Sequence, residues 1–237
     1  RGDEVPAKLY AKGVRAGDVR YFDYNEDGDI TDADRVNVGK AIPDFYGGIT
    51  SNFSYKGFDL SLFGQFSVGG KVMAAWRGVN GSEGTDHLGL ALSNVKVGDR
   101  GESVEQFFNI SKEVANGYWR GEGTSNSIPR PVRIGVHTGY DYDYNVQTST
   151  RYLEDASYFK LKTVTLGYTL PESITKKIHV NSLRVYVSAD NLLTFTKYSG
   201  YDPETSFSGS PGDSNYGVDF GLQPVLRTFI FGLNLNF

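Results

Sequence analysis

The residues best suited to chemistry are the acidic side chains of one short loop, residues 23–34. Asp23, Asn25 and Asp27 place side-chain oxygens at alternate positions, and Gly28 allows the sharp turn that follows. This order matches the D-x-[DN]-x-[DN]-G pattern of calcium-binding loops. Carboxylate and carbonyl oxygens are the ligands that Ca²⁺ prefers, so the sequence predicts a calcium site here.

The rest of the loop completes the set of expected ligands. The Asp29 backbone carbonyl is the next expected ligand, and position twelve holds Asp34 where the pattern has Glu. The flanking residues 18–22 and 35–39 have extended rather than helical character, which favours a structural calcium clip over a sensor. The alternative is a solvated turn rich in Asp and Asn. The candidate ligands are Asp23, Asn25, Asp27, Asp29 and Asp34.

Other chemical constellations are missing from the sequence. The three histidines, His87, His137 and His179, share no ligand spacing, and there is no Ser/His/Asp arrangement, P-loop or dinucleotide fingerprint. The chain has no cysteine, which excludes disulfides and thiol chemistry. The chain has 24 basic and 28 acidic residues, and the basic residues form no stripe. Nucleic acid is therefore not an expected partner. We expect no enzymatic activity.

Aromatic side chains gather in the long segment 70–157. Such side chains can stack on sugar rings or grip a peptide, and the alternative is that they pack the core of the segment itself. The candidate substrate-binding residues are Trp76, Tyr118, Trp119, Tyr140, Tyr142 and Tyr144.

The end of the chain shows the clearest structural pattern. Residues 228–237 alternate almost without fault, which is the period of a strand with one apolar face and one mostly polar face. The length suits a tilted strand crossing a bilayer, and no run of 18 apolar residues offers a membrane-spanning helix. The apolar positions are Phe229, Phe231, Leu233, Leu235 and Phe237.

Four further segments share this alternation, so we predict an all-β fold. No Asp, Glu, Lys or Arg lies in the central part of the five apolar faces. A lipid-facing Lys or Arg at the bilayer midplane would cost roughly 2–4 kcal/mol, so this absence favours a transmembrane wall over a soluble sandwich. A change of phase before Thr163 indicates either a bulge near this residue or emergence of the chain from the membrane there. The expected strands are 45–55, 57–68, 158–170, 182–193 and 227–237.

The connections alternate between short and long. Lys56-Gly57 and residues 171–181 are short, whereas 70–157, with an expected helix over 103–116, and 195–225 are long. Outer-membrane barrels alternate short periplasmic turns with long extracellular loops. We therefore expect an extracellular segment 1–44, barrel strands within 45–237 and a periplasmic C-terminus. Tyr55, Phe58, Tyr168 and Phe237 would then form a periplasmic aromatic girdle.

Several blocks carry a family resemblance. The stretch Gly17-Asp18-Val19-Arg20-Tyr21-Phe22-Asp23 through Asp34-Arg35 resembles a stretch of the SusC-like TonB-dependent transporters. The blocks 151–171, 183–192 and 198–203, with Arg227-Thr228-Phe229 and the closing Phe237, resemble their late strands.

This resemblance implies import of glycan or peptide fragments across the outer membrane of a Gram-negative bacterium. It also implies energy supplied through TonB, a SusD-like surface lipoprotein as partner, and a barrel of about 22 strands around a plug. Five strands cannot close such a barrel, so the chain is expected to be its C-terminal portion, working with the plug and the other strands. The alternatives are a soluble extracellular calcium-stabilised β module that binds carbohydrate and, more weakly, a dockerin-like module.

Overall fold

The structure is a computed structural model that describes residues 5–77, 89–91, 93–97, 102–106, 112–130, 132–134, 144–204 and 216–237. The chain divides into two compact units. The first contains Arg1–Val38 and Ala74–Leu153, and the second contains Gly39–Met73 and Glu154–Phe237. Each unit is described by itself.

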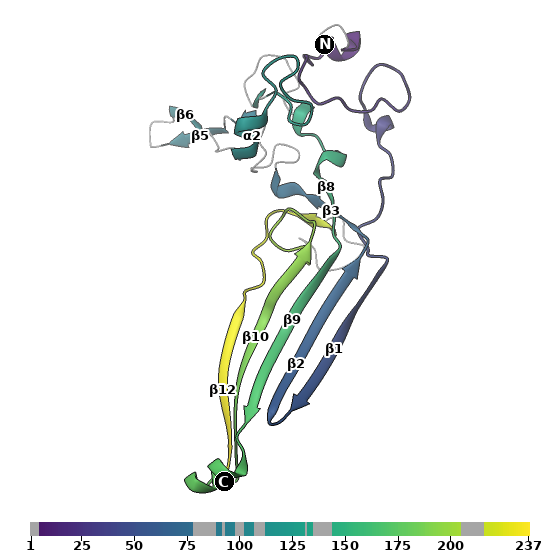
Figure 1. The fold of residues 1–237 in the computed structure, drawn as a ribbon. Helices are drawn as coiled ribbons and strands as arrows, with labels where there is room; N and C mark the ends of the chain where they lie inside the picture. Colours follow the sequence, from purple (N-terminus) through teal and green to yellow (C-terminus); the bar gives the residue numbers. More distant parts are fainter. Residues whose placement is uncertain are drawn as a thin grey trace. The chain divides into compact units, whose positions relative to one another are not determined.

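The second unit is built on five long antiparallel strands in the order β1-β2-β9-β10-β12 (Figure 1). All five strands predicted from the alternation are confirmed, with ends that differ by at most three residues from the prediction. Their bounds are Phe45–Tyr55 for β1, Phe58–Val68 for β2, Tyr158–Thr169 for β9, Ser182–Thr196 for β10 and Thr228–Asn236 for β12.

The hairpin of β1 and β2 turns on Lys56-Gly57, as predicted. Both turn residues have positive φ, 47° and 88°, which suits the tight turns that match strand twist. A Cβ at Gly57 would lie 2.8 Å from the backbone oxygen of Thr169 in β9. Glycine is therefore required here both by the backbone conformation and by the approach of the neighbouring strand.

The predicted irregularity near Thr163 is a bulge at Lys162. Thr163 pairs with Phe63 but Leu161 pairs with Gly64, which leaves Lys162 without a partner in β2. The register with β10 shifts at the same level, where Asn191 has a φ of 53°. The bulge restores the phase, so Lys160 lies on the same face as Thr163 and Thr165.

The sheet has two chemically different faces. One, called here the apolar face, carries exposed aromatic and aliphatic side chains such as Phe53, Leu166 and Phe231, which are 60%, 46% and 80% exposed. The opposite face, called the polar face, carries the side chains that hydrogen-bond across the strands. A sheet face that is mostly apolar and largely uncovered is unusual in contact with water and typical of contact with lipid.

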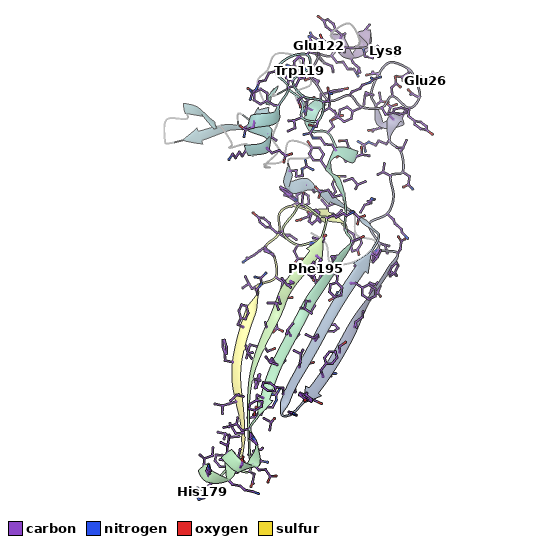
Figure 2. All side chains as sticks on the ribbon, viewed as in Figure 1. Lys8, Glu26, Trp119, Glu122, His179 and Phe195 are labelled. Carbon is purple, nitrogen blue, oxygen red and sulfur yellow. The ribbon has the colours of Figure 1, made fainter. Side chains whose placement is uncertain are left out.

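Both short turns lie at the same end of the sheet as the C-terminus (Figure 1). The short connection after Pro171 contains α3, Glu172–Thr175, followed by the 3₁₀ turn η7, Lys176–Ile178. His179 follows in the left-handed conformation, at the tip of this turn (Figure 2). Phe58 pairs with Tyr55 and Tyr168 at this end, as an aromatic girdle requires.

The remaining elements are short. The helix predicted over 103–116 is wrong in its first part, where β6, Glu102–Gln106, pairs with β5; residues 107–111 lie outside the described residues, and α2 covers only Lys112–Gly117. The pairing of β5 with β6 outweighs the helical preference that the capping pattern gives to these residues. No helix among the described residues is long and apolar enough to cross a membrane. The other bounds are α1 Ala7–Ala11, η2 Asp32–Asp34, β3 Lys71–Ala74, η3 Ala75–Arg77, β4 Gly89–Ala91, β5 Ser93–Val97, β7 Val132–Ile134, η5 Tyr144–Val146, η6 Thr150–Tyr152, β8 Leu153–Asp155 and β11 Val218–Asp219.

Candidate functional site

The polar face of the sheet carries paired side chains along its length. Near the short-turn end, Arg184 of β10 donates two hydrogen bonds to Asp59 of β2, with Nε to Oδ1 at 2.9 Å and Nη2 to Oδ2 at 2.5 Å. Two-point contacts between a guanidinium and a carboxylate are the strongest ion-pair geometry available to side chains. This face can therefore keep charged groups fixed where the apolar face has none.

Further along the polar face, hydroxyl groups connect β9 to β10. Thr163 donates to Asp190 at 3.0 Å, and the hydroxyls of Thr165 and Ser188 lie 2.8 Å apart. The sequence pattern placed these residues on the polar face, but it gave no sign of which pairs would form. The arrangement offers a polar wall of fixed side chains.

Lys160 marks the long-loop end of the polar face. Its ammonium group is buried, with the residue only 2% exposed, and it binds Asp202 and Glu204 of the segment that follows β10. Burying an ammonium group is costly unless anionic partners surround it. Sequence reasoning missed this cluster because its members lie more than forty residues apart.

The acidic loop of the first unit is closed by its own hydrogen bonds. The backbone N–H groups of Asp27 and Gly28 donate to the two carboxylate oxygens of Asp23 at 3.2 and 2.7 Å. Asp34 accepts from the N–H groups of Tyr24 and Thr31, which holds the two ends of the loop together. These bonds hold the pKa of Asp34 below its ordinary value, the Thr31 bond contributing most.

Lysines of the N-terminal segment also reach this loop. Lys12 forms an ion pair with Asp29 at 2.6 Å, and Lys8 donates to the Asp27 backbone oxygen at 2.6 Å. The hydrogen bond from Lys12 is the main reason that the pKa of Asp29 lies below its ordinary value. A metal ion would have to compete with these lysines for the loop.

The fit to calcium is therefore incomplete in this conformation. Within the described residues, no group of three or more His, Cys, Asp or Glu side chains is arranged to hold a metal ion. The carboxylates of Asp23 and Asp34 are engaged with backbone N–H groups instead. The flanks are not helical, as expected, apart from η2 at the loop end. Calcium binding by Asp23, Asn25, Asp27, Asp29 and Asp34 stays a prediction.

Asp18 organises the part of the first unit beside this loop. It binds Arg130 at 2.6 Å and accepts a hydrogen bond from the side chain of Asn145 at 2.9 Å. Asn145 is only 1% exposed and also accepts from the backbone of Val19 at 2.8 Å. This network joins three stretches of chain that are distant in the sequence, and no sequence motif predicts it.

Two of the predicted substrate-binding aromatics pack against the N-terminal segment. The Trp119 ring covers Gly17 so closely that any side chain at Gly17 would collide with it. Tyr144 makes an edge contact with the Tyr21 ring at 5.0 Å between centroids, and its backbone oxygen accepts from the Tyr21 hydroxyl at 2.6 Å. Burial raises the pKa of Tyr144 to about 12. These contacts are those of a small core.

The other predicted aromatics are spread over the first unit. Trp76 lies half-buried in η3, and the Arg120 guanidinium lies 4.6 Å from the centroid of the Tyr118 ring. Tyr140 and Tyr142 lie outside the described residues. The role of these aromatic residues in binding substrate stays a prediction.

Comparison with known proteins gives several relatives, although no family model matches the chain. TonB-dependent receptor P3 of Formosa agariphila is 33% identical over 225 residues, which cover 93% of this chain and 19% of that protein. TonB-dependent receptor SusC of Bacteroides thetaiotaomicron is 26% identical over 98% of this chain and 19% of that protein. The chain thus spans about a fifth of the length of these curated relatives.

Solved structures agree with this similarity. The RagAB peptide importer in its open-open state matches 84% of this chain and 18% of that chain, with 25% sequence identity and a TM-score of 0.53. In its closed-closed state the identity is 22% and the TM-score 0.54, a likeness of fold alone.

Proposed function

Because the chain is homologous over nearly its whole length to the C-terminal part of SusC-like TonB-dependent receptors, we propose that it forms part of the wall of an outer-membrane nutrient importer. The relatives are receptors and transporters rather than enzymes. The observation that carries the proposal is the sheet with one uncovered apolar face and one hydrogen-bonded polar face. In a barrel these faces are the lipid side and the lumen side.

The proposed orientation follows from the connections. The two short turns and the C-terminus lie in the periplasm, and the long segments 70–157 and 195–225 lie outside the cell with residues 1–44. Support comes from the aromatic residues Tyr55, Phe58 and Tyr168 at the short-turn end, since aromatic girdles mark membrane interfaces.

The proposed cargo is a glycan or peptide fragment, captured with a SusD-like surface lipoprotein. The solved relative is named a peptide importer, which favours peptides only by analogy. The plug, the other strands of the barrel and the contact with TonB belong to the remainder of such a transporter. Trp76, Tyr118, Trp119, Tyr140, Tyr142 and Tyr144 are the proposed aromatic contacts for cargo in this chain.

We also propose that the acidic loop binds Ca²⁺ as a structural clip. Support comes from the spacing of its oxygens and from the closed shape that its hydrogen bonds already give it. Calcium binding would require the ligands to turn from backbone N–H groups toward a common centre.

Detergent dependence tests the proposed membrane wall. The protein should fractionate with outer membranes and stay monodisperse only in detergent. Recovery of the folded chain as a monomer in detergent-free buffer would contradict the proposal and favour the alternative, a soluble calcium-stabilised β module that binds carbohydrate.

A further inference from the structure

The segment that leaves β10 folds back onto the start of β9. The Thr196 hydroxyl donates to the backbone oxygen of Ser157 at 2.8 Å. The Ser199 backbone N–H and hydroxyl then donate to the two carboxylate oxygens of Glu154, at 2.8 and 2.7 Å. These contacts fix the direction of the chain immediately after the strand.

The next residues are fixed by a buried charge. The Lys160 ammonium lies 2.5 Å from Asp202 and 2.7 Å from Glu204, and Lys162 also binds Glu204 at 2.6 Å. Lys160 and Asp202 are only 2% and 6% exposed. Removing one partner of such a pair leaves an uncompensated buried charge, which is strongly destabilising.

The register shows on which side of the sheet these contacts lie. Gln65 pairs with Lys160, and directly opposed residues share a face. The Gln65 amide donates to the Tyr158 hydroxyl at 3.2 Å and to Glu204 at 3.4 Å. Asp202 and Glu204 therefore lie over the polar face, the proposed lumen side, and not over the apolar face.

A second buried contact holds the returning part of this connection. The Tyr198 hydroxyl donates to Asp219 of β11 at 2.5 Å, and Asp219 accepts the backbone N–H groups of Gly221 and Leu222 at 2.8 and 3.1 Å. Tyr198 and Asp219 are 5% and 1% exposed. Residues 198–204 are therefore anchored at both ends.

Between these anchors, Tyr201 is 77% exposed. We propose that residues 198–204 form a fixed ledge over the lumen side of the wall, with Lys160 as its positioning residue and Tyr201 as its presented aromatic side chain. This inference rests on the proposed function, because the polar face is a lumen wall only in a barrel. The ledge narrows the lumen at its long-loop end, and the position of the ledge does not change.

A spin label attached at Tyr201→Cys tests the ledge, because the sequence contains no other cysteine. The label is read in the full-length protein in detergent, with and without Lys160→Met. We expect a restricted spectrum that becomes mobile in the Lys160→Met variant. Amide exchange over 198–204 should accelerate by a factor on the order of 10 to 100.

Two further variants keep the test decisive. Lys162→Met is the matched control, because among the described residues Lys162 forms an ion pair with Glu204 alone, and its side chain is more exposed than that of Lys160. In this variant the label at Tyr201→Cys should stay restricted. Glu204→Gln, at a partly exposed site, replaces Lys160→Met if that variant does not fold, as judged by heat-modifiable gel mobility, and it should also mobilise the label. A spectrum equal to that of wild type in a folded Lys160→Met variant, or in Glu204→Gln, would overturn the ledge.

The two proposals fail separately. Loss of outer-membrane fractionation would contradict the importer but would leave the spin-label result intact as a statement about residues 198–204. A mobile label in an outer-membrane protein would contradict the ledge alone.

Discussion

Arg184 and Asp59 form a two-point ion pair although their strands, β10 and β2, are separated in the sheet by β9. The pair passes over Gly167, where an added Cβ would collide with the guanidinium and lie 2.5 Å from an oxygen of Asp59. A glycine in the middle of a strand weakens it locally, and here that cost is offset by a contact between strands that are not neighbours.

The first prediction concerns this glycine. Gly167→Ala should destabilise the protein by up to about 1 kcal/mol, because the new methyl group must push aside the ends of two flexible side chains and break their two-point contact. Urea unfolding of the detergent-solubilised protein measures the change. Thr165→Ala, on the same face of the same strand, is the control and should cost about 0.5–1.5 kcal/mol. Equal stability of Gly167→Ala and wild type would contradict the steric account.

The second prediction separates the two faces of β9. Val164→Arg should cost roughly 2–4 kcal/mol in a bilayer, because the charge faces lipid near the middle of the strand. Thr165→Arg, one residue away on the polar face, should cost less because its charge stays in the lumen. Folding yields into vesicles measure both variants. A larger loss for Thr165→Arg would reverse the assignment of faces.

The third prediction concerns calcium. Asp23→Ala combined with Asp27→Ala should abolish Ca²⁺ binding measured by calorimetry, since both ligands are lost. Asp32→Asn combined with Glu26→Gln changes the same number of charges in the same loop at residues outside the predicted ligand set, and it should leave binding intact. Unchanged metal content in the first double variant would contradict the calcium proposal.

The fourth prediction is a pH dependence of the ledge. Burial alone would raise the pKa of Glu204, but hydrogen bonds from Lys160 and Lys162 outweigh it and hold this pKa below the ordinary 4.5. A lowered carboxyl pKa adds stability that is fully present above the ordinary value and is lost as pH falls through the lowered one. The Tyr201→Cys label should therefore stay restricted at about pH 5 and become mobile only when the pH falls below the ordinary carboxyl value of 4.5.

The control for this titration is Glu204→Gln, whose label should already be mobile at neutral pH and should change less with acid. Release of the wild-type label well above pH 5 would show that another group controls the ledge.

The sequence predicted the strands well because an apolar face in lipid imposes a strict period of two on every segment that crosses. Even the bulge at Lys162 was visible as a break in that period. The helix over 103–116 failed where β6 forms, because a capping pattern is only a local preference that strand pairing can override.

The sequence by itself thus determined the five strands, their two faces and the spacing of the acidic loop, since each depends on neighbours along the chain. Only the tertiary structure decided which distant charges meet. Three ion pairs join residues that lie far apart in the sequence, and no local pattern predicts them. They are Asp59 with Arg184, Lys160 with Asp202, and Asp18 with Arg130. Strand order brings Asp59 and Arg184 together. For Lys160 and Asp202, burial makes the pair obligatory, because an unpaired charge there would be too costly.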